Sequence, residues 1–321
     1  MPSTEFISSS PAFAATGLPP PCAEELSRWH RLGSQLLREM GVIEEPTVRR
    51  VYHMALPVYF FVDSMRSRPR RTNPGQAKAA RTLLVGLQCL QGGGKTTLCE
   101  QLSNLFRQEG LSCVVASIDD FYRTHRELEQ LKESYPDQPL LHSRGAPGTH
   151  DMQLMMSVVN SLRRAGASVG VPRYDKSAHN GQGDRFPEDT WPRYDSPVDV
   201  MILEGWCLGF QQGEAPLPAN MRLVDQYLEA FDALYEQLDC FIIMQAQDVN
   251  LVYQWREEAE LQLRAAGRGA MTAEEITRFV DRYMFSYRQY LQPFYERGGP
   301  LPKERTLQFV IGPSRLPLHS P

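Results

Sequence analysis

The sequence predicts an α/β fold in which a five-stranded parallel sheet is covered by helices on both faces. From Thr82 onward, short and almost continuously apolar runs alternate with helical patterns, as expected for strands buried on both faces. Polar or glycine-rich stretches follow several of these runs, at the sheet edge where ligands bind in such folds. The predicted strands are TLLVGL (82–87), SCVVAS (112–117), VDVMIL (198–203), DCFIIMQA (239–246) and TLQFVIG (306–312).

The chain is predicted to divide into three parts. Residues 1–22 are rich in Ser, Ala and Pro and suggest a flexible leader, and residues 23–75 suggest a helical extension with a basic, turn-rich linker at 66–78. Gly41 is placed to end the first helix, and the aromatic segment 51–62, broken by Pro57, is expected in a core. The third part is the main domain, with helices expected near 95–109, 150–164, 221–238, 248–266 and 272–291.

Composition narrows the class of function. The 321 residues carry a net charge of −4, which argues against a chain devoted to nucleic-acid binding. No apolar run reaches the ~20 residues that a membrane-spanning helix needs, so no membrane partner is expected. The six cysteines include no CxxC pair, which favours reduced thiols in a cytoplasmic compartment. A monomer or small homo-oligomer is expected.

The first predicted strand leads into GLQCLQGGGKTTL (86–98). GGGKTT fits the second half of a phosphate-binding P-loop, GxxxxGK[ST], although Cys89 stands where the strict pattern has glycine. Glycines let backbone N–H groups face a phosphate, and the start of the following helix adds positive charge. Lys95 would reach the β- and γ-phosphates and Thr96 would hold Mg²⁺; the alternative is a glycine-rich turn with a surface lysine. The predicted ATP-binding residues are Gln91, Gly92, Gly93, Gly94, Lys95, Thr96 and Thr97.

Acidic residues follow the next two strands. Asp119 and Asp120 come after the second strand, where a carboxylate can accept the proton of an attacking hydroxyl, although either of them could instead cap a short helix. Glu204 ends the third strand and resembles a Walker B acid that orients Mg²⁺ or its water; the alternative is a solvent-facing carboxylate.

Basic residues follow in loops and in a predicted lid. Arg173, Lys176 and Arg185 occupy a polar loop that could bind an anionic substrate, although Arg173 could instead pair with Asp175 on the surface. Arg256 falls where a lid arginine would stabilise a transferred phosphoryl group, but it could equally pair with Glu260 at i,i+4. The same alternative applies to Arg264 and Arg268.

Together these motifs closely resemble the plant and cyanobacterial type of D-glycerate 3-kinase, which belongs with the phosphoribulokinase, uridine kinase and pantothenate kinase group. The similarity runs collinearly over residues 50–312. It is carried by QGGGKTTL, SIDDFY, PGTHD, VPRYDKSA, GDR, EGWCLGF, VYQWREEAE and RYMFSYRQY.

The resemblance implies a P-loop kinase-type three-layer αβα domain over residues 76–321. It further implies transfer of the γ-phosphate of ATP, with Mg²⁺, to the 3-hydroxyl of D-glycerate. Asp119 falls on the catalytic aspartate of the wider group, with Lys95 and Arg256 as further catalytic residues and Glu204 beside the metal. The substrate-binding set is Asp119, Tyr122, His150, Arg173, Lys176 and Arg185. Another small acceptor, or an ATP-binding regulator that transfers nothing, stays an alternative.

Overall fold

The computed structural model describes residues 2–41, 44–67, 82–213, 217–267 and 271–319. Its centre is a six-stranded sheet with the order β10-β9-β8-β1-β7-β2, in which every pair except β10–β9 is parallel. Two small antiparallel pairs, β3–β6 and β4–β5, lie outside it. The strands are β1 (Leu83–Cys89), β2 (Cys113–Ser117), β3 (Ser168–Gly170), β4 (Tyr174–Asp175), β5 (Asp184–Arg185), β6 (Arg193–Asp195), β7 (Val200–Gly205), β8 (Cys240–Ala246), β9 (Thr306–Ile311) and β10 (Pro317–Leu318).

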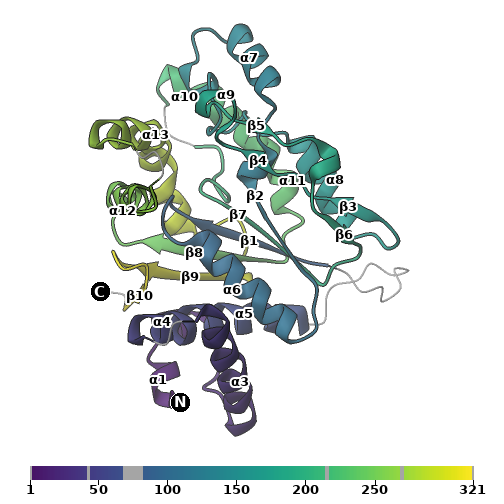
Figure 1. The fold of residues 1–321 in the computed structure, drawn as a ribbon, viewed down its shortest axis with the longest axis vertical. Helices are drawn as coiled ribbons and strands as arrows, with labels where there is room; N and C mark the ends of the chain where they lie inside the picture. The colour runs from purple at the N-terminus through teal and green to yellow at the C-terminus, as the bar shows by residue number, and fades with distance from the viewer. Residues whose placement is uncertain (1, 42–43, 68–81, 214–216, 268–270, 320–321) are drawn as a thin grey trace.

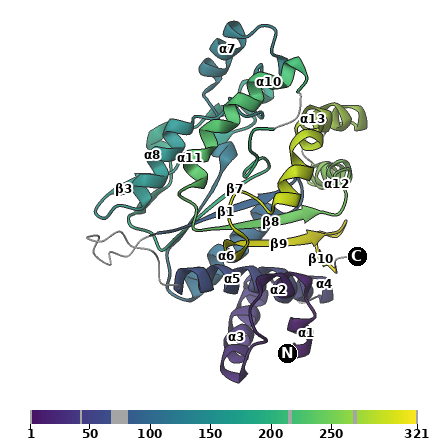
Figure 2. The same cartoon turned by 180° about the vertical axis from the view of Figure 1, so that it is seen from behind.

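Helices cover both faces of the main sheet (Figures 1 and 2). Helix α6 (Lys95–Gln108) contacts β1, β2 and β7, while α2 (Pro11–Thr16) contacts β9 and α5 (Leu56–Ser67) contacts β8. On the other face, Phe294 of α13 (Ala273–Arg297) packs against Phe241 of β8, with ring centroids 6.2 Å apart. The remaining α-helices are α1 (Thr4–Ser8), α3 (Ala23–Met40), α4 (Glu45–Arg50), α7 (His125–Ser134), α8 (Met152–Leu162), α9 (Ala178–Gly181), α10 (Ala219–Gln226), α11 (Asp232–Tyr235) and α12 (Leu251–Ala265).

The predicted parallel sheet and its alternation with helices are confirmed. All five predicted strands exist, and the short antiparallel β10 adds a sixth at one edge. The helix expected over 221–238 is wrong as a single element, because η5, a 3₁₀ segment at Tyr227–Phe231, separates α10 from α11. The buried Leu228 and Phe231 lie within that segment, so tertiary packing competes there with regular helical geometry.

The flexible leader expected over residues 1–22 is wrong for Thr4–Ser8 and Pro11–Thr16, which form α1 and α2. Ser3 and Ser10 cap the two helices, and Gly17 ends the second in the left-handed conformation. Ile7 is fully buried, so the Ser- and Ala-rich composition hides an apolar contact with the core. The predicted linker falls mostly outside the described residues, and the domain boundary at residue 76 stays a prediction.

Pro57 also has a different effect from the predicted break. Residues 45–67 form one continuous helical path, with a π-helical turn, η1 (Val51–Ala55), immediately before α5. Proline has no N–H to donate to the carbonyl four residues earlier, which belongs to His53. The Ser10 hydroxyl donates to that carbonyl instead, at 2.7 Å. The aromatic segment is buried as expected.

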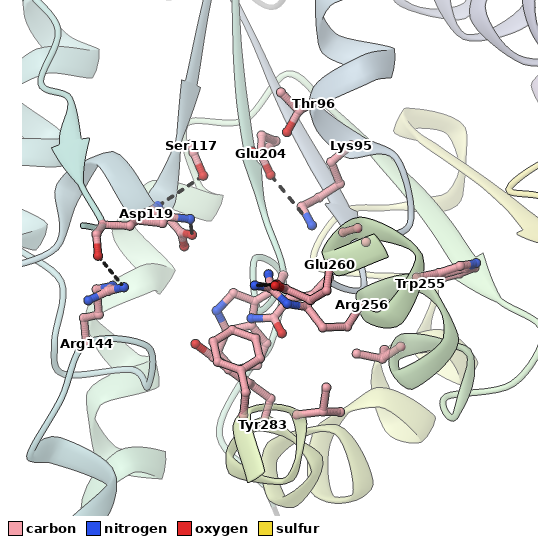
Figure 3. Close-up of a pocket in the computed structure, with 18 of the residues that line it drawn as sticks. Lys95, Thr96, Ser117, Asp119, Arg144, Glu204, Trp255, Arg256, Glu260 and Tyr283 are labelled. Carbon is pink, nitrogen blue, oxygen red and sulfur yellow. Dashed lines mark hydrogen bonds and ion pairs between the residues drawn. The ribbon is translucent and has the colours of Figure 1, made fainter. Parts of the chain in front are cut away.

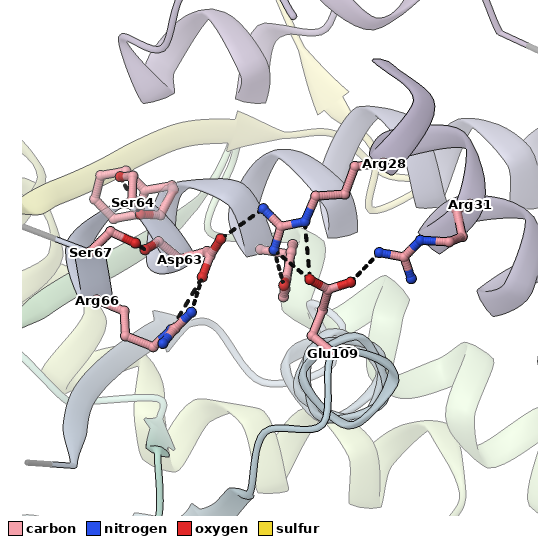
Figure 4. A network of polar contacts seen from close by, with 9 residues as sticks. Arg28, Arg31, Asp63, Ser64, Arg66, Ser67 and Glu109 are labelled. Atoms are coloured by element: carbon pink, nitrogen blue, oxygen red, sulfur yellow. Dashed lines mark hydrogen bonds and ion pairs between the residues drawn. The ribbon is translucent and has the colours of Figure 1, made fainter. Parts of the chain in front are cut away.

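A polar network ties the N-terminal helices to α6 (Figure 4). The Arg28 guanidinium of α3 donates to Glu109 at 2.8 Å, to Asp63 at 3.0 Å and to the Tyr59 hydroxyl at 2.9 Å. Glu109 follows the last residue of α6 directly. The extension therefore joins the helix that begins at the predicted P-loop. No helix within the described residues is long and apolar enough to cross a membrane.

Candidate active site

The predicted phosphate loop has the strand–loop–helix setting that its chemistry requires. It runs from the end of β1 at Cys89 to the start of α6 at Lys95, and Gly92 and Gly94 adopt positive φ angles of 75° and 93°. A Cβ on Gly93 would lie 2.2 Å from Cys89 Sγ. The Cys89 side chain therefore occupies the space that a side chain at position 93 would need, and the glycine at that position leaves the space free. The loop can therefore hold a cysteine at position 89, where the strict P-loop motif has glycine.

Lys95 and Glu204 face each other across this loop (Figure 3). The Lys95 Nζ donates to the carbonyls of Cys89 and Leu90 at 3.1 and 3.2 Å and lies 4.0 Å from Glu204 Oε2. Burial raises the pKa of Glu204, and the positive charge of Lys95 opposes that shift. Glu204 Oε2 is buried and accepts no hydrogen bond from any described residue. A buried carboxylate oxygen with free lone pairs is a suitable ligand for a cation or its bound water.

The two aspartates after β2 have different surroundings. Both lie in η2, a 3₁₀ turn over Ile118–Phe121. Asp120 accepts from the Ser117 backbone N–H at 3.0 Å and from Arg173 at 3.3 Å, so it completes the capping box whose N-cap residue is Ser117. Asp119 instead accepts from Lys176 Nζ at 2.5 Å. Although burial opposes it, the Lys176 charge and hydrogen bond hold the pKa of Asp119 below its usual range.

Tyr122 and His150 form the buried floor next to Asp119. Their rings stack with centroids 4.6 Å apart, and both side chains are almost fully buried. Burial lowers the pKa of His150 to about 4, so the ring is neutral at physiological pH. Neither ring nitrogen of His150 has a hydrogen-bond partner among the described residues. Tyr122 lines the cavity described below, whereas His150 lies behind it.

Arg185 does not join the predicted anion-binding set. Its guanidinium donates to the Tyr122 carbonyl at 2.9 Å and to Asp151 at 3.3 Å, and its side chain is 11% exposed. Asp151 in turn caps α8 by accepting from the Leu154 N–H at 2.9 Å. Arg185 therefore fixes the backbone beneath Tyr122 and is not among the described residues that line the cavity.

In this structure Arg256 makes the i,i+4 ion pair considered above. Its guanidinium pairs with Glu260, whose carboxylate is 3% exposed and also accepts from the Met271 N–H at 2.8 Å. The same guanidinium lies 4.7 Å from the centre of the Phe279 ring. Both charged side chains face the cavity, so the pair does not remove Arg256 from the site. Arg264 donates to the Met271 carbonyl at 3.3 Å, and Arg268 lies outside the described residues.

These elements enclose a cavity of about 1410 Å³. This volume exceeds that of a typical single-ligand pocket, about 300–1,000 Å³, and is large enough for a nucleotide and a small acceptor. Figure 3 shows the phosphate-loop side chains on one side, Asp119 on a second and the α12–α13 side chains on a third. Of the predicted site residues, those that line it are Gln91, Gly92, Lys95, Thr96, Asp119, Tyr122, Arg173, Lys176, Glu204 and Arg256.

Arg144, Arg282 and Tyr283 are among the cavity residues that were not proposed as site residues from the sequence. Arg144 comes from the loop before α8 and donates to the Lys176 carbonyl at 3.2 Å. Arg282 and Tyr283 reach the cavity from α13, whose sequence pattern predicts only an amphipathic helix. Arg144 immediately precedes a Gly-Ala-Pro-Gly turn, and this was the signal available. The two α13 residues begin RYMFSYRQY (282–290), which carries part of the family resemblance, and this was the signal available for them.

Known proteins resemble this chain in both sequence and fold. The model of the phosphoribulokinase / uridine kinase family matches residues 84–298. The chloroplastic D-glycerate 3-kinase of Arabidopsis thaliana is 34% identical over 334 aligned residues, covering 98% of this chain and 72% of that protein. The probable ATP-dependent kinase TDA10 of Saccharomyces cerevisiae is 37% identical, covering 70% of this chain and 83% of that protein.

A solved structure of a D-glycerate 3-kinase from Cryptococcus neoformans superimposes with a TM-score of 0.72 at 29% identity. The match covers 83% of this chain and 98% of that one. The family model matches well over half of the chain, and the relatives match its sequence and its fold. The chain therefore belongs to the phosphoribulokinase / uridine kinase family and is an ATP-dependent kinase.

Proposed function

We propose that this kinase transfers the γ-phosphoryl group of ATP to the 3-hydroxyl of D-glycerate, giving 3-phosphoglycerate. Two of the relatives reported above carry the name D-glycerate 3-kinase. The observation that carries the proposal is the pairing of Asp119 with Lys176 on the cavity wall. It places a carboxylate that can accept a proton beside a cation that can bind an anionic acceptor.

The charge of this wall favours a small carboxylic acid over a neutral acceptor. Arg144 and Arg173 line the same cavity as Lys176. A planar guanidinium can bind a carboxylate through two parallel hydrogen bonds, which fixes orientation as well as charge. Glycerate has few atoms, so strong ionic contacts must supply most of its affinity. A neutral nucleoside would bring no anion to Arg144, and none to Arg173 and Lys176 beyond their partners Asp120 and Asp119.

The proposed chemistry uses groups already in place. Asp119 accepts the proton of the 3-hydroxyl, whose oxygen forms a bond to the γ-phosphorus as the bond to the β–γ bridging oxygen breaks. The electron pair of that bond leaves with ADP. Lys95 neutralises charge on the transferred group, and Arg256 does so from the lid side after exchanging its Glu260 partner for phosphate.

The residues present fit a Mg²⁺ ion. Thr96 and Glu204 would hold it or its water, since Glu204 has a buried oxygen without a hydrogen-bond donor among the described residues. Bound Mg²⁺ would neutralise charge on the β- and γ-phosphates. The described residues contain no cluster of three or more His, Cys, Asp or Glu able to hold a metal. Such a sparse set suits Mg²⁺, which takes one or two protein oxygens plus substrate phosphates.

A direct acceptor screen tests the proposal. The purified full chain with MgATP is offered D-glycerate, L-glycerate, uridine, pantothenate and ribulose 5-phosphate, and ADP release is followed. We expect the highest kcat/KM with D-glycerate, and we expect NMR to identify the product as 3-phosphoglycerate and not the 2-isomer. A higher kcat/KM with another acceptor would contradict the substrate assignment. Slow ATP hydrolysis unaffected by any acceptor would favour a regulatory nucleotide-binding role.

A further inference from the structure

An arginine from the N-terminal extension lies against the phosphate loop. Arg50 is the last residue of α4, directly before the π-helical turn η1, all five residues of which are buried. Its Nη1 lies 3.9 Å from where a Cβ on Gly94 would stand, immediately before Lys95, so Arg50 contacts the loop from outside the cavity lining. Packed π-helical turns inside helices are rare and frequently mark functional sites. This turn fixes the end of α4 and so fixes Arg50 beside the loop.

Arg50 lacks the compensating partner that its neighbours have. Its Nη2 donates to the Ser314 carbonyl at 3.4 Å, and within the described residues no carboxylate lies within ion-pairing distance of it. By contrast, Arg49 pairs with Glu45 at 3.0 Å. A half-buried guanidinium with one long hydrogen bond retains donors for another acceptor.

A second arginine reaches the same glycine from the C-terminal loop. Arg315 Cδ lies 3.8 Å from the same Cβ position on Gly94, and its Nε donates to the Gly92 carbonyl at 2.6 Å. Its backbone has a φ of 61° within the turn between β9 and β10, where the Arg315 N–H donates to the Gly312 carbonyl at 2.9 Å. Arg315 also pairs with Glu258 at 2.6 Å, so Arg50 is the less neutralised of the two.

This arrangement is electrostatically unfavourable until an anion binds. Burial and the nearby Arg315 both lower the pKa of Arg50, because each disfavours its charge. The start of α6, with its free N–H groups, adds further positive potential at the same place. The anion that this kinase brings to the loop is the phosphate chain of its nucleotide. Phosphate oxygens would accept from the free Arg50 donors and relieve the like-charge contact.

We propose that Arg50 binds the phosphate chain of ATP and ADP, so that the N-terminal extension completes the nucleotide site. The proposal rests on nucleotide binding at the phosphate loop, not on which acceptor is phosphorylated. Binding of ADP without any acceptor therefore tests it separately from the glycerate assignment. The class of ligand is a nucleoside di- or triphosphate, and adenosine lacks the group that Arg50 would contact.

The experiment compares Arg50→Met, Arg50→Lys and the matched control Arg49→Met in the full-length chain by calorimetric titration with ADP, ATP and adenosine. We expect Arg50→Met to weaken ADP and ATP binding about 10-fold or more, with adenosine affinity unchanged. Arg50→Lys should lose less, and Arg49→Met should match the wild type. The ADP affinity of the wild type should also fall more steeply with added NaCl than that of Arg50→Met.

Thermal melting without nucleotide separates this role from a structural one. Unchanged ADP affinity in Arg50→Met would overturn the proposal, whether or not its melting temperature falls. An equal loss of adenosine and ADP affinity would also overturn it, because it would show a distorted site and not a lost phosphate contact. If Arg50→Met does not fold, Arg50→Gln takes its place in the same titrations and in the salt series, with Arg50→Lys as before.

Discussion

Lys176 Nζ donates to Asp119 Oδ2 at 2.5 Å, joining residues that are 57 positions apart in the sequence. The pair lies on the cavity wall that faces the phosphate loop. Lys176 keeps the carboxylate ionised but also makes it a weak base, since a general base works best with a pKa near the operating pH. An acceptor carboxylate that attracts Lys176 would raise the basicity of Asp119 when the hydroxyl is in place.

Replacing Lys176 with methionine tests this coupling through the pH profile. Because Lys176 lowers the pKa of Asp119, its removal raises that pKa, and protonation then inactivates the base at a higher pH. We expect the acidic limb of kcat/KM to move to higher pH and the KM for glycerate to increase. Lys132→Met, on the exposed side of α7, serves as the control. An unchanged acidic limb would show that Lys176 does not set the ionisation of the catalytic group.

Asp119 and Asp120 should respond differently to the same substitution. Asp119→Asn removes the proposed proton acceptor, so kcat should fall about 10²–10⁴-fold while ADP affinity is retained. Asp120→Asn keeps a capping oxygen for the Ser117 N–H and should retain most of kcat with a small loss of stability. Steady-state kinetics and ADP titration of both variants provide the measurement. The opposite ranking of kcat would assign proton abstraction to Asp120.

The comparison of these two acids shows where sequence reasoning reaches its limit. The positions of the five main strands along the chain and of the phosphate loop were predictable, because periodicity and glycine-rich turns are local properties. Which of the two adjacent carboxylates pairs with Lys176 and which with Arg173 depends on side chains that approach from another loop. No spacing rule contains that information.

The roles of the basic residues could not be predicted from the sequence for the same reason. Arg185 and Arg144 both come from polar, glycine-containing stretches of sequence, yet Arg185 donates to the Tyr122 carbonyl and Arg144 lines the cavity. Likewise, the Ser- and Ala-rich N-terminus has the composition of a disordered segment. It nevertheless folds, because Ile7 and Phe13 are buried in the core and Ser10 donates to the His53 carbonyl, a contact over 43 positions.

Arg256 and Glu260 allow a structural role to be separated from a catalytic one. Arg256→Ala removes the ion-pair partner of the buried Glu260 carboxylate and should reduce the free energy of unfolding by about 1–3 kcal/mol. We expect kcat to fall as well. Adding Glu260→Gln removes that charge while its amide oxygen still accepts from Met271 N–H, so stability should return toward the wild type. Chemical denaturation and steady-state kinetics are measured for both. We expect kcat to remain reduced about 10²-fold or more in the double variant; recovery of kcat along with stability would limit Arg256 to a structural role.

Arg28 and Arg31 provide a matched pair for testing how firmly the N-terminal helices are joined to the kinase fold. Both pair with Glu109, but Arg28 also donates to Asp63 and Tyr59, whereas the Arg31 side chain is 52% exposed. Arg28→Ala should therefore reduce the free energy of unfolding by about 1–2 kcal/mol, a range that allows for partial solvent screening.

Arg31→Ala should change the free energy of unfolding by no more than about 0.5 kcal/mol. Urea denaturation of the full-length chain measures both variants, and a single transition with an unchanged m-value would indicate one cooperative unit. If Arg28→Ala instead produces a separate early transition, the extension unfolds independently of the sheet. The contacts between the N-terminal extension and α6 would then be too weak to hold Arg50 against the phosphate loop.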